Sequence, residues 1–309
     1  MFSKNQAAEN MKVSVVGQNN AVSLIAQHIC RLKEVTELAL VDEVHGIPNF
    51  TLTELKRIAS IVRSDVRLIA GRNPSVLADS EIVVCCPFDC NQLQKPSQFG
   101  YAGSVGSTNT DQTKGIHQHA PKAKIVVATY PSSDIVQSVH QSINANLGQI
   151  IGISGCLINT DLKIGISEAV GVSVEDVVSL IIGNDDECHM LPQYCRAGGI
   201  PIDQLLNRNQ IVKLGSHVRN QPKKSVSTDF LHTISTLTAE VVNTILLDKK
   251  RIMTVATVIG TNDTEVCLNL PAKIGQNGAE KFTSLHLTNE QLEEFTGLVK
   301  RAITQRSRL

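Results

Sequence analysis

The sequence has no tryptophan, few aromatic residues and no excess of either charge. Aromatic residues make up 3% of its 309 residues, and 29 basic side chains balance 29 acidic ones. Nucleic acids and anionic membranes attract clustered basic side chains, and lysine and arginine form no long block here. The composition therefore argues against a nucleic-acid partner and against binding to a charged membrane surface.

Long apolar segments are also missing. Hydrophobic residues make up 42% of the chain, as in an ordinary globular protein. No apolar run reaches the roughly 18 residues of a membrane-spanning helix. Residues 1–17 are polar and lack the apolar core of a signal peptide. We therefore expect a soluble, cytoplasmic protein whose thiols are reduced.

The cysteines lack the spacing of a metal site. Several of the eight lie inside apolar runs, where a cysteine usually acts as a small hydrophobic residue. Cys86 and Cys90 are close in sequence, but no second close pair stands at the distance that a zinc site requires. The sequence therefore predicts no bound metal.

Short β-branched runs alternate with helical patterns in the first half of the chain. The expected strands are KVSVVG (12–17), ELALVDEV (37–44), VRLIAG (66–71), EIVVCCP (81–87) and KAKIVVATYP (122–131). Amphipathic patterns between these runs predict helices. This alternation predicts an α/β fold, with a Rossmann-type parallel sheet flanked by helices.

The second half has a different rhythm, which predicts an α+β domain. A helix and a strand are expected in 161–183, a long amphipathic helix in 227–251, and strands in 251–260 and 265–275. The final segment, 287–309, is expected to be a helix, with Thr288 as its N-cap and Glu290 and Glu293 near its positive end. The rhythm changes near 145–155. We therefore predict a Rossmann-like domain over 11–150 and a second domain over 151–309, for which the turn and the resemblance described below imply dinucleotide binding and substrate binding.

The turn after the first strand is a candidate nucleotide site. In a dinucleotide-binding unit, a glycine-rich turn lets the backbone approach the pyrophosphate at a helix N-terminus. Here Gly17 fits the first glycine, whereas Asn19 and Val22 stand where the second and third would be. Asp42, at the end of the second strand, stands near the spacing of the acid that binds ribose hydroxyls. Two interpretations stay open: NAD binding through these residues, or a Rossmann-like unit that needs no cofactor.

The order of these motifs resembles the lactate/malate dehydrogenase family over roughly residues 11–305. The similar segments are KVSVVG…ELALVDEV, ADSEIVVCCP, KIVVATYPSSDIV, GVSVEDVVSLIIG, AGGIPIDQLL and LPAKIGQNGAEKF. The last two favour the malate-dehydrogenase-like branch. The resemblance implies hydride transfer between NAD and a 2-hydroxy acid. It also implies an acid/base histidine, an aspartate that orients it, and arginines that hold the substrate carboxylate.

The aspartate and one arginine of that family precede the helix that leads to GVSVEDV. Counted back from Gly171 without a gap, Ile158 stands at the aspartate position and Asp161 at the arginine position. Ile158 cannot accept a proton or a hydrogen bond. Asp161 would repel a substrate carboxylate.

The family histidine lies just after the strand that here ends in LIIG. In GNDDECHMLP its place is taken by Asp185 when counted from the left, or by Asp186 when counted from Pro192. His189 is close in sequence, but its side chain is expected to leave the loop at a different point.

The arginines that this chemistry needs are also missing. No arginine stands between Arg72 and Arg196, a span that includes the loop FDCNQLQKPSQFGYAGSVGSTNT after the fourth strand. Lys95 offers a point charge but not the two-pronged contact of arginine. Tyr130 stands where the resemblance implies an asparagine beside the nicotinamide.

The favoured hypothesis is a degenerate member of the family that has lost the standard chemistry and associates as a homo-oligomer. One alternative is an active NAD-dependent oxidoreductase with atypical residues. Another is a non-redox enzyme that binds a small molecule in the old cleft through Asp161, Asp185, Asp186 and His189. A further alternative is a nucleotide-binding sensor without chemistry that relies on Gly17 and Asp42. Whether the chain is an enzyme stays open at this point.

Overall fold

The computed structural model describes residues 11–43, 45–86, 113–219, 228–260, 264–282 and 284–306. The chain divides into two compact units, one formed by Met1–Ala128 with Ser227–Lys249 and the other by Thr129–Val226 with Lys250–Leu309. These units differ from the predicted limits of 11–150 and 151–309 in two ways. They part after Ala128, and the segment Ser227–Lys249 returns to the first unit.

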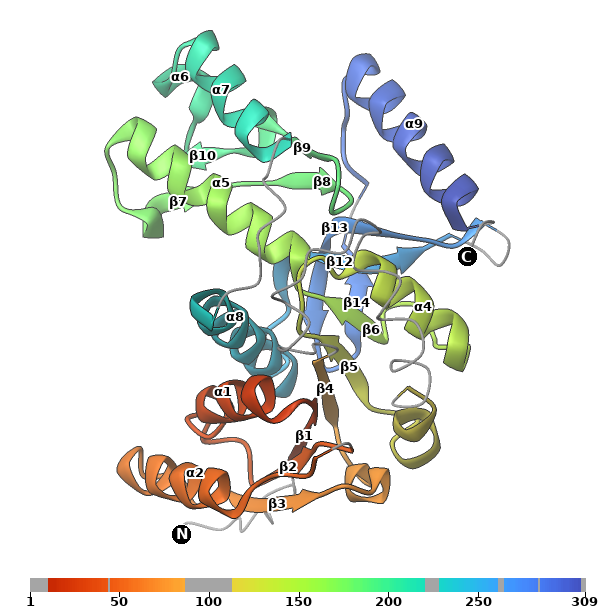
Figure 1. Ribbon diagram of the computed structural model, residues 1–309. Coiled ribbons are helices and arrows are strands. Elements are labelled where there is room, and N and C mark those ends of the chain that lie inside the picture. Colours follow the sequence, from red (N-terminus) through yellow and green to blue (C-terminus); the bar gives the residue numbers. More distant parts are fainter. Residues whose placement is uncertain are drawn as a thin grey trace, which may run out of the picture. The chain divides into compact units, whose positions relative to one another are not determined.

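The first unit contains a parallel sheet with the strand order β3-β2-β1-β4-β5 (Figure 1). Its strands are β1 (Lys12–Gly17), β2 (Glu37–Val41), β3 (Arg67–Gly71), β4 (Ile82–Cys86) and β5 (Lys124–Val127). Its helices are α1 (Asn19–Ile29), α2 (Asn49–Ile61), the 3-10 turn η1 (Pro74–Leu77), a helix over 113–119, and α8 (Thr228–Leu246). α8 packs along α1 and also contacts β5.

Burial explains why the central strands read as continuous apolar runs. Val13, Val15 and Val16 of β1 are 0% exposed, and β2 and β4 are buried along their whole length. A parallel strand is covered on both faces, so both faces favour β-branched residues. The expected parallel α/β arrangement is thus confirmed for this unit.

A buried carboxylate joins the beginnings of three neighbouring strands. Glu37 of β2 is 3% exposed, and its Oε1 lies 3.0 Å from Nζ of Lys12 in β1. Its Oε2 forms an ion pair with Arg67 of β3. A buried charge is tolerated when it is paired in this way.

The second unit mixes helices with mainly antiparallel strands. Its helices are α4 (Ser133–Ile143), α5 (Ser154–Val170), η2 (Val174–Asp176), η3 (Pro192–Tyr194), α6 (Ile202–Leu205), α7 (Arg208–Arg219) and α9 (Asn289–Arg306). Its strands are β6 (Ile150–Gly152), β7 (Val177–Val178), β8 (Ile181–Gly183), β9 (Cys188–Met190), β10 (Arg196–Ala197), β11 (Ile200–Pro201), β12 (Arg251–Ile259), β13 (Val266–Gly275) and β14 (Gly278–Lys281).

The larger sheet of this unit runs in the order β6-β12-β13-β8-β9, with β14 also paired to β13. All of these pairs are antiparallel. A smaller antiparallel sheet has the order β11-β10-β7. The α+β character expected for the second half is therefore confirmed, and β8 and β9 form a short hairpin beside β13.

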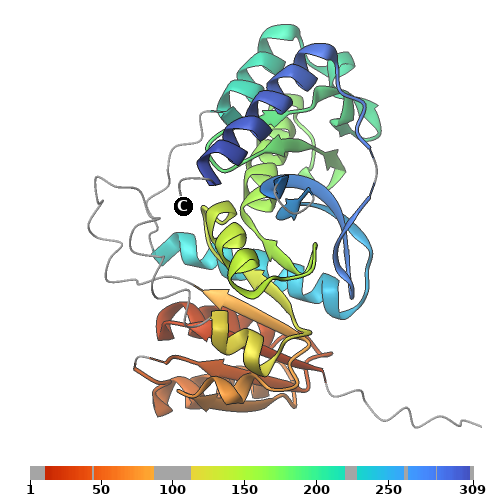
Figure 2. The same cartoon turned by 90° about the vertical axis from the view of Figure 1, so that its right-hand side faces the viewer.

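α9 begins where the sequence predicts its N-cap. Oγ1 of Thr288 accepts a hydrogen bond from the backbone N–H of Gln291, at 3.3 Å, and Oε1 of Gln291 accepts one from N–H of Thr288, at 3.0 Å. This reciprocal pair is a capping box. Leu298 of α9 packs with Val266 and Leu268 of β13 in a small apolar core. Figure 2 shows α9 at the same end of the second unit as α7.

The sequence predicts no membrane-spanning segment. Among the described residues, no helix is long and apolar enough to cross a membrane.

Candidate functional site

The hairpin between β8 and β9 carries the residues at the position of the family histidine. Gly183 ends β8 at φ 149°, and a Cβ there would lie 2.2 Å from the carbonyl oxygen of Glu187, so only glycine fits. Oδ1 of Asn184 accepts hydrogen bonds from the N–H groups of Asp186 and Glu187, at 3.0 and 2.7 Å. This turn fixes the backbone on both sides of Asp185.

Asp185 is held by three hydrogen bonds. Its Oδ2 accepts from the backbone N–H groups of Ser132 and Ser133, at 2.8 and 2.7 Å, where α4 begins. Its Oδ1 accepts from Nδ2 of Asn269, at 2.9 Å. The first N–H groups of a helix have no partner within the helix and carry partial positive charge. Asp185 supplies the missing acceptor and joins the hairpin to α4 and β13.

A buried polar network lies behind this carboxylate. Oγ atoms of Ser132 and Ser154 lie 2.7 Å apart, and Oγ of Ser154 donates to Oδ1 of Asn269, at 3.1 Å. Ser132, Ser154 and Asn269 are all 0% exposed. Because Oδ1 of Asn269 accepts from Ser154, its Nδ2 faces Asp185. Together with the N–H groups of α4, this fixes the orientation of the carboxylate from two sides.

Tyr130 lies near the acidic residues that the sequence analysis assigns to the candidate site. It is 6% exposed. Burial first, and then the charges of Asp185, Cys188, Asp161 and Asp186, raise the pKa of the Tyr130 hydroxyl far above its ordinary value. All of these neighbours are acidic groups, which disfavour the phenolate. Tyr130 therefore lies within electrostatic range of Asp161, Asp185 and Asp186.

Asp161 comes from α5, a different part of the fold than the hairpin. Asp161 is half-buried on α5, and Ile158 lies one turn earlier on the same helix at 2% exposure, within the core. Asp186 is exposed on the hairpin turn. Ile158 thus contributes packing, and Asp161 contributes negative charge near Tyr130.

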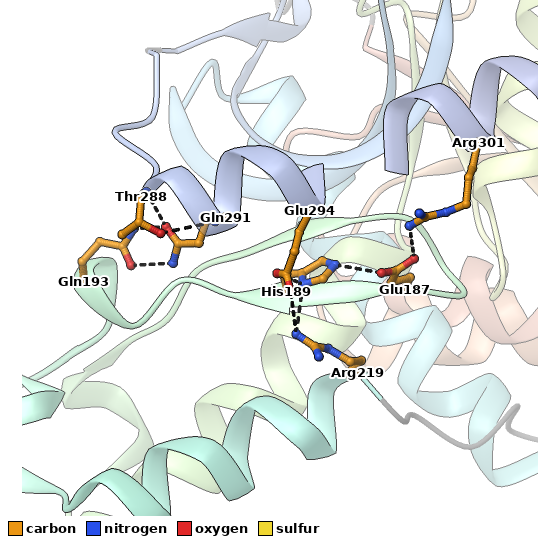
Figure 3. Close-up of polar contacts among 8 residues, drawn as sticks. All are labelled: Glu187, His189, Gln193, Arg219, Thr288, Gln291, Glu294 and Arg301. Carbon is orange, nitrogen blue, oxygen red and sulfur yellow. Dashed lines mark hydrogen bonds and ion pairs between the residues drawn. The ribbon is translucent and has the colours of Figure 1, made fainter. Parts of the chain in front are cut away.

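His189 does not join this cluster. Successive side chains of a strand point to opposite faces, and Cys188, its neighbour in β9, faces Asp185 and Asn269. His189 is 7% exposed and faces Glu187 and Glu294 instead (Figure 3). Its side chain thus leaves from a different place than the acidic residues, as the sequence predicts.

The nucleotide-type turn of the first unit has a structural reason for its glycine. Gly17 has φ 150°, and a Cβ there would lie 2.4 Å from the carbonyl oxygen of Cys86 in β4. α1 follows directly and begins at Asn19. Its N-cap residue, Gln18, makes no side-chain cap hydrogen bond, and its first turn holds no acidic residue. Val22 is 0% exposed, within the core.

The carboxylate of Asp42 bonds to the backbone of the turn that follows it in the chain. It is 2% exposed, and its Oδ1 accepts a hydrogen bond from N–H of His45, at 2.9 Å. Its backbone oxygen accepts from N–H of Gly46, also at 2.9 Å. The carboxylate therefore closes the turn that follows β2.

Lys95, Cys90 and the loop 88–110 after the fourth strand lie outside the described residues. Among the residues that are described, no group of three or more His, Cys, Asp and Glu side chains is placed to hold a metal ion.

Sequence reasoning missed Asn269, whose side chain donates to Asp185, and Ser154, which donates to Asn269. Asn269 interrupts the apolar run VCLNLPAKIG of β13, and Ser154 begins a helix directly after the buried strand β6. A polar residue inside a buried run usually has a polar partner. That signal marks Asn269, although it does not identify Asp185 as the partner.

In sequence, the chain is similar to known malate dehydrogenases. A malate dehydrogenase of Heliobacterium modesticaldum is 28% identical over 297 residues, covering 92% of this chain and 94% of that protein. A malate dehydrogenase of Halalkalibacterium halodurans is 26% identical over 302 residues, covering 94% of each. No family model matches the chain.

Solved structures show the same fold. A lactate dehydrogenase of Cryptosporidium parvum, complexed with lactic acid and nicotinamide adenine dinucleotide, has a TM-score of 0.82 at 18% identity, covering 97% of this chain and 98% of that one. A malate dehydrogenase of Salinibacter ruber has a TM-score of 0.79 at 23% identity, covering 97% and 98%.

The parallel sheet and the α+β unit define a dehydrogenase-type α/β fold. More narrowly, the chain has the lactate/malate dehydrogenase fold, and its sequence relatives support the resemblance to that family.

Proposed function

We propose that this lactate/malate dehydrogenase-like protein does not catalyse NAD-dependent oxidation of 2-hydroxy acids. The observation that carries the proposal is the use of Asp185. A general acid/base must give and take a proton at the substrate. Oδ2 of Asp185 accepts from two N–H groups of α4, so a proton on this oxygen would face two donors. Asp185 thus caps the N-terminus of α4.

The missing carboxylate clamp supports the same proposal. A 2-oxo acid substrate is an anion, and arginine binds such a group through two parallel hydrogen bonds. No arginine stands between Arg72 and Arg196 in the sequence. The groups around Tyr130 that shift its pKa are acidic. A substrate carboxylate would therefore meet repulsion where it needs attraction.

The test is an assay of NADH oxidation with oxaloacetate, pyruvate and a series of other 2-oxo acids. The malate dehydrogenase of Heliobacterium modesticaldum serves as positive control. We expect no turnover above the rate without enzyme. Removal of one general base alone typically costs a factor of about 10²–10⁴. Saturable turnover with any of these acids would refute the proposal.

NAD binding is a separate question from catalysis. The residues of the first unit that would meet the cofactor lie at the N-terminus of α1, where Gly17 gives the tight turn and the first N–H groups of the helix follow. We propose that Gly17, Asn19 and the first N–H groups of α1 would hold its pyrophosphate, and Asp42 its ribose. When bound, the cofactor supplies a hydride. Contact with the ribose would require Asp42 to give up its bond to His45, so we expect weak binding.

Titration with NADH, followed by the fluorescence of NADH itself, tests this part. The chain has no tryptophan, so the protein background is low. Saturable binding at millimolar concentration or below is expected. Asp42→Asn should weaken it, because an amide cannot accept two ribose hydroxyls as a carboxylate does. An unchanged signal at millimolar NADH would exclude the cofactor.

A second candidate is a non-redox role for the acidic cluster. The specific observation in its favour is the buried Tyr130, which is 6% exposed and lies within electrostatic range of Asp161, Asp185 and Asp186. Such a site would suit a neutral or cationic small molecule. A thermal-shift screen of amines and neutral polyols tests it. A hit that is lost in Tyr130→Phe and in Asp186→Asn would support this candidate. The same hit in both variants would exclude it.

A further inference from the structure

The turn after β2 closes over Asp42, the residue that would meet the ribose of a dinucleotide. Asp42 is 2% exposed, and its Oδ1 accepts a hydrogen bond from the backbone N–H of His45, at 2.9 Å. A carboxylate at this position recognises an unsubstituted ribose by accepting hydrogen bonds from its hydroxyls. A carboxylate that is buried and bonded to its own turn presents little surface to a ribose. The acid that would favour NAD is therefore poorly exposed for that contact.

An arginine lies beside this turn, at the end of the neighbouring strand. β2 and β3 are parallel, and Val41 pairs with Gly71. The next residues, Asp42 and Arg72, therefore leave the sheet side by side. Nη2 of Arg72 donates to the backbone oxygen of His45, at 2.7 Å, and the residue is exposed. A guanidinium carries five N–H donors, so this bond uses only part of its capacity.

The turn also gives this arginine a place to pack. Gly46 has φ 72°, in the left-handed region that favours glycine, and a Cβ there would lie 2.9 Å from Nε of Arg72. The arginine side chain thus packs against a position that has no side chain. This contact and the bond to His45 hold the guanidinium at the end of β3. A side chain that is already held loses less conformational freedom when it binds an anion.

The other ionisable groups at this end of β2 differ in where they lie. The imidazole of His45 is 68% exposed, and its Nδ1 lies 4.0 Å from Oδ2 of Asp42. The carboxylate of Glu43 lies beside the helix over 113–119, with Oε1 3.8 Å from the position that a Cβ of Gly115 would take. The exposed groups next to Asp42 are therefore Arg72 and His45, and both can donate hydrogen bonds to a phosphate.

We propose that this end of the sheet selects an adenine dinucleotide that carries a phosphate on the 2′ oxygen of its ribose, as NADPH does. The inference rests on the cofactor site proposed above for the first unit. In Rossmann-type folds, a nearby arginine accommodates a 2′-phosphate, and hydrogen bonds from arginine to phosphate are strengthened by charge. Arg72 binds the phosphate, and the imidazole of His45 adds a donor. Asp42 keeps its bond to His45, which an unsubstituted ribose would require it to give up.

Titration of the full chain with NADPH and with NADH, each followed by its own fluorescence, tests this preference. We expect NADPH to bind about tenfold more tightly, the size of effect typical of hydrogen bonds to a charged group. If NADH binds and NADPH binds no more tightly, the preference is wrong and the cofactor site stands. If neither binds at millimolar concentration, the cofactor site is wrong and the preference with it. Neither titration involves turnover, so both results are independent of the proposed loss of dehydrogenase activity.

A pair of isomers separates recognition of the 2′ position from attraction to any extra charge. Bound NADPH is displaced with adenosine 2′,5′-bisphosphate and, separately, with adenosine 3′,5′-bisphosphate, which has the same charge. The 2′,5′ compound should displace NADPH at a concentration about tenfold lower. Equal potency of the two isomers, or no displacement by the 2′,5′ compound, would overturn the proposal.

Variants assign the preference to Arg72. Arg72→Met keeps an unbranched side chain against Gly46 and removes the charge, so NADPH should bind about tenfold more weakly while NADH binding, which also reports that the variant is folded, changes little. Arg72→Lys should keep part of the preference, because it retains the charge without the planar fork. Arg63→Met removes an exposed arginine that stands before β3 and should keep the wild-type ratio. A preference that survives in Arg72→Met, or that disappears in Arg63→Met, would contradict the assignment.

Discussion

At the scale of single residues, Asp185 has a structural role at the position where the resemblance places the family's catalytic histidine. It accepts three hydrogen bonds, two of them from the start of α4. We expect Asp185→Ala to lower the free energy of unfolding by about 2 kcal/mol, the upper range for loss of a helix cap. Urea unfolding followed by circular dichroism measures the change.

A matched control stands next to it. Asp186 is exposed on the same turn, so Asp186→Ala should change the free energy of unfolding by no more than about 0.5 kcal/mol. Asp185→Gly should in addition be stabilised by added formate, which can occupy the vacated acceptor position at the helix N-terminus. If Asp185→Ala and Asp186→Ala were equally stable, the structural role of Asp185 would be wrong.

Glu37 gives a second prediction at this scale. Glu37→Gln leaves the ammonium group of Lys12, which is 8% exposed, without its carboxylate. Arg67 is 69% exposed at its side chain, so water compensates much of its loss. We expect a loss of about 2 kcal/mol in the free energy of unfolding, below the full cost of breaking a buried pair.

The pair of Glu54 with Arg57 on α2 provides the comparison. Both side chains are more than half exposed, and surface pairs contribute little. Glu54→Gln should therefore cost less than about 1 kcal/mol. Calorimetry of the two variants under the same conditions gives the contrast. Equal costs would show that burial of Glu37 does not matter.

At the scale of elements, the packing of α8 on α1 leads to a prediction about acid. Burial first, and then the charges of Arg31 and His232, lower the pKa of His28 on α1. A lowered folded-state pKa means that the unfolded chain binds the proton more readily. The contribution of His28 to stability is complete above about pH 6.5, the unperturbed value. It is lost as the pH falls through the folded-state pKa.

The measurement is hydrogen exchange of α1 and α8 between about pH 8 and about pH 5.5, corrected for intrinsic rates. Protection should fall toward the acid end in the wild type and fall less in His28→Asn. His117→Asn, an exposed histidine of the same unit, should behave as the wild type. Identical profiles for the wild type and His28→Asn would contradict the assignment.

Some features of the elements could be predicted from the sequence, and others depend on contacts that the sequence does not show. Strand runs such as 12–17 and the N-cap at Thr288 depend on neighbours in the sequence, so local pattern was enough to predict them. The place of α8 depends on its contact with α1, from the other end of the chain. Nothing in the amphipathic pattern of 227–251 shows which helix it packs against.

The same distinction applies to the candidate site. The position of Asp185 at the end of a strand could be predicted from the sequence, since a resemblance in motif order located the family histidine there. Its partners Ser132 and Asn269 stand far away along the chain and meet it only in the fold. The separation of His189 from Asp185 followed from the alternation of side chains along β9.

At the scale of the whole molecule, the sequence predicts self-association. We propose a homo-oligomer with a second copy of the chain against α2. Phe50 and Ile61 of α2 are 69% and 78% exposed. Their spacing is close to three turns of about 3.6 residues, so they lie on one face of the helix. The exposed pair of Glu54 and Arg57 lies between them on this face, so the proposed interface has a charged centre between two apolar side chains.

Sedimentation velocity at several protein concentrations tests this association. The wild type should sediment as a dimer or tetramer. The double change Phe50→Ser with Ile61→Ser should shift the population toward the single chain, because it removes apolar area from the interface without cutting into the core. Val212→Ser removes an equally exposed apolar side chain from α7, at 58% exposure, and should leave the oligomer intact. A wild type that sediments as a single chain would refute the proposed oligomer. An oligomer that withstands the double change would place its interface elsewhere than α2.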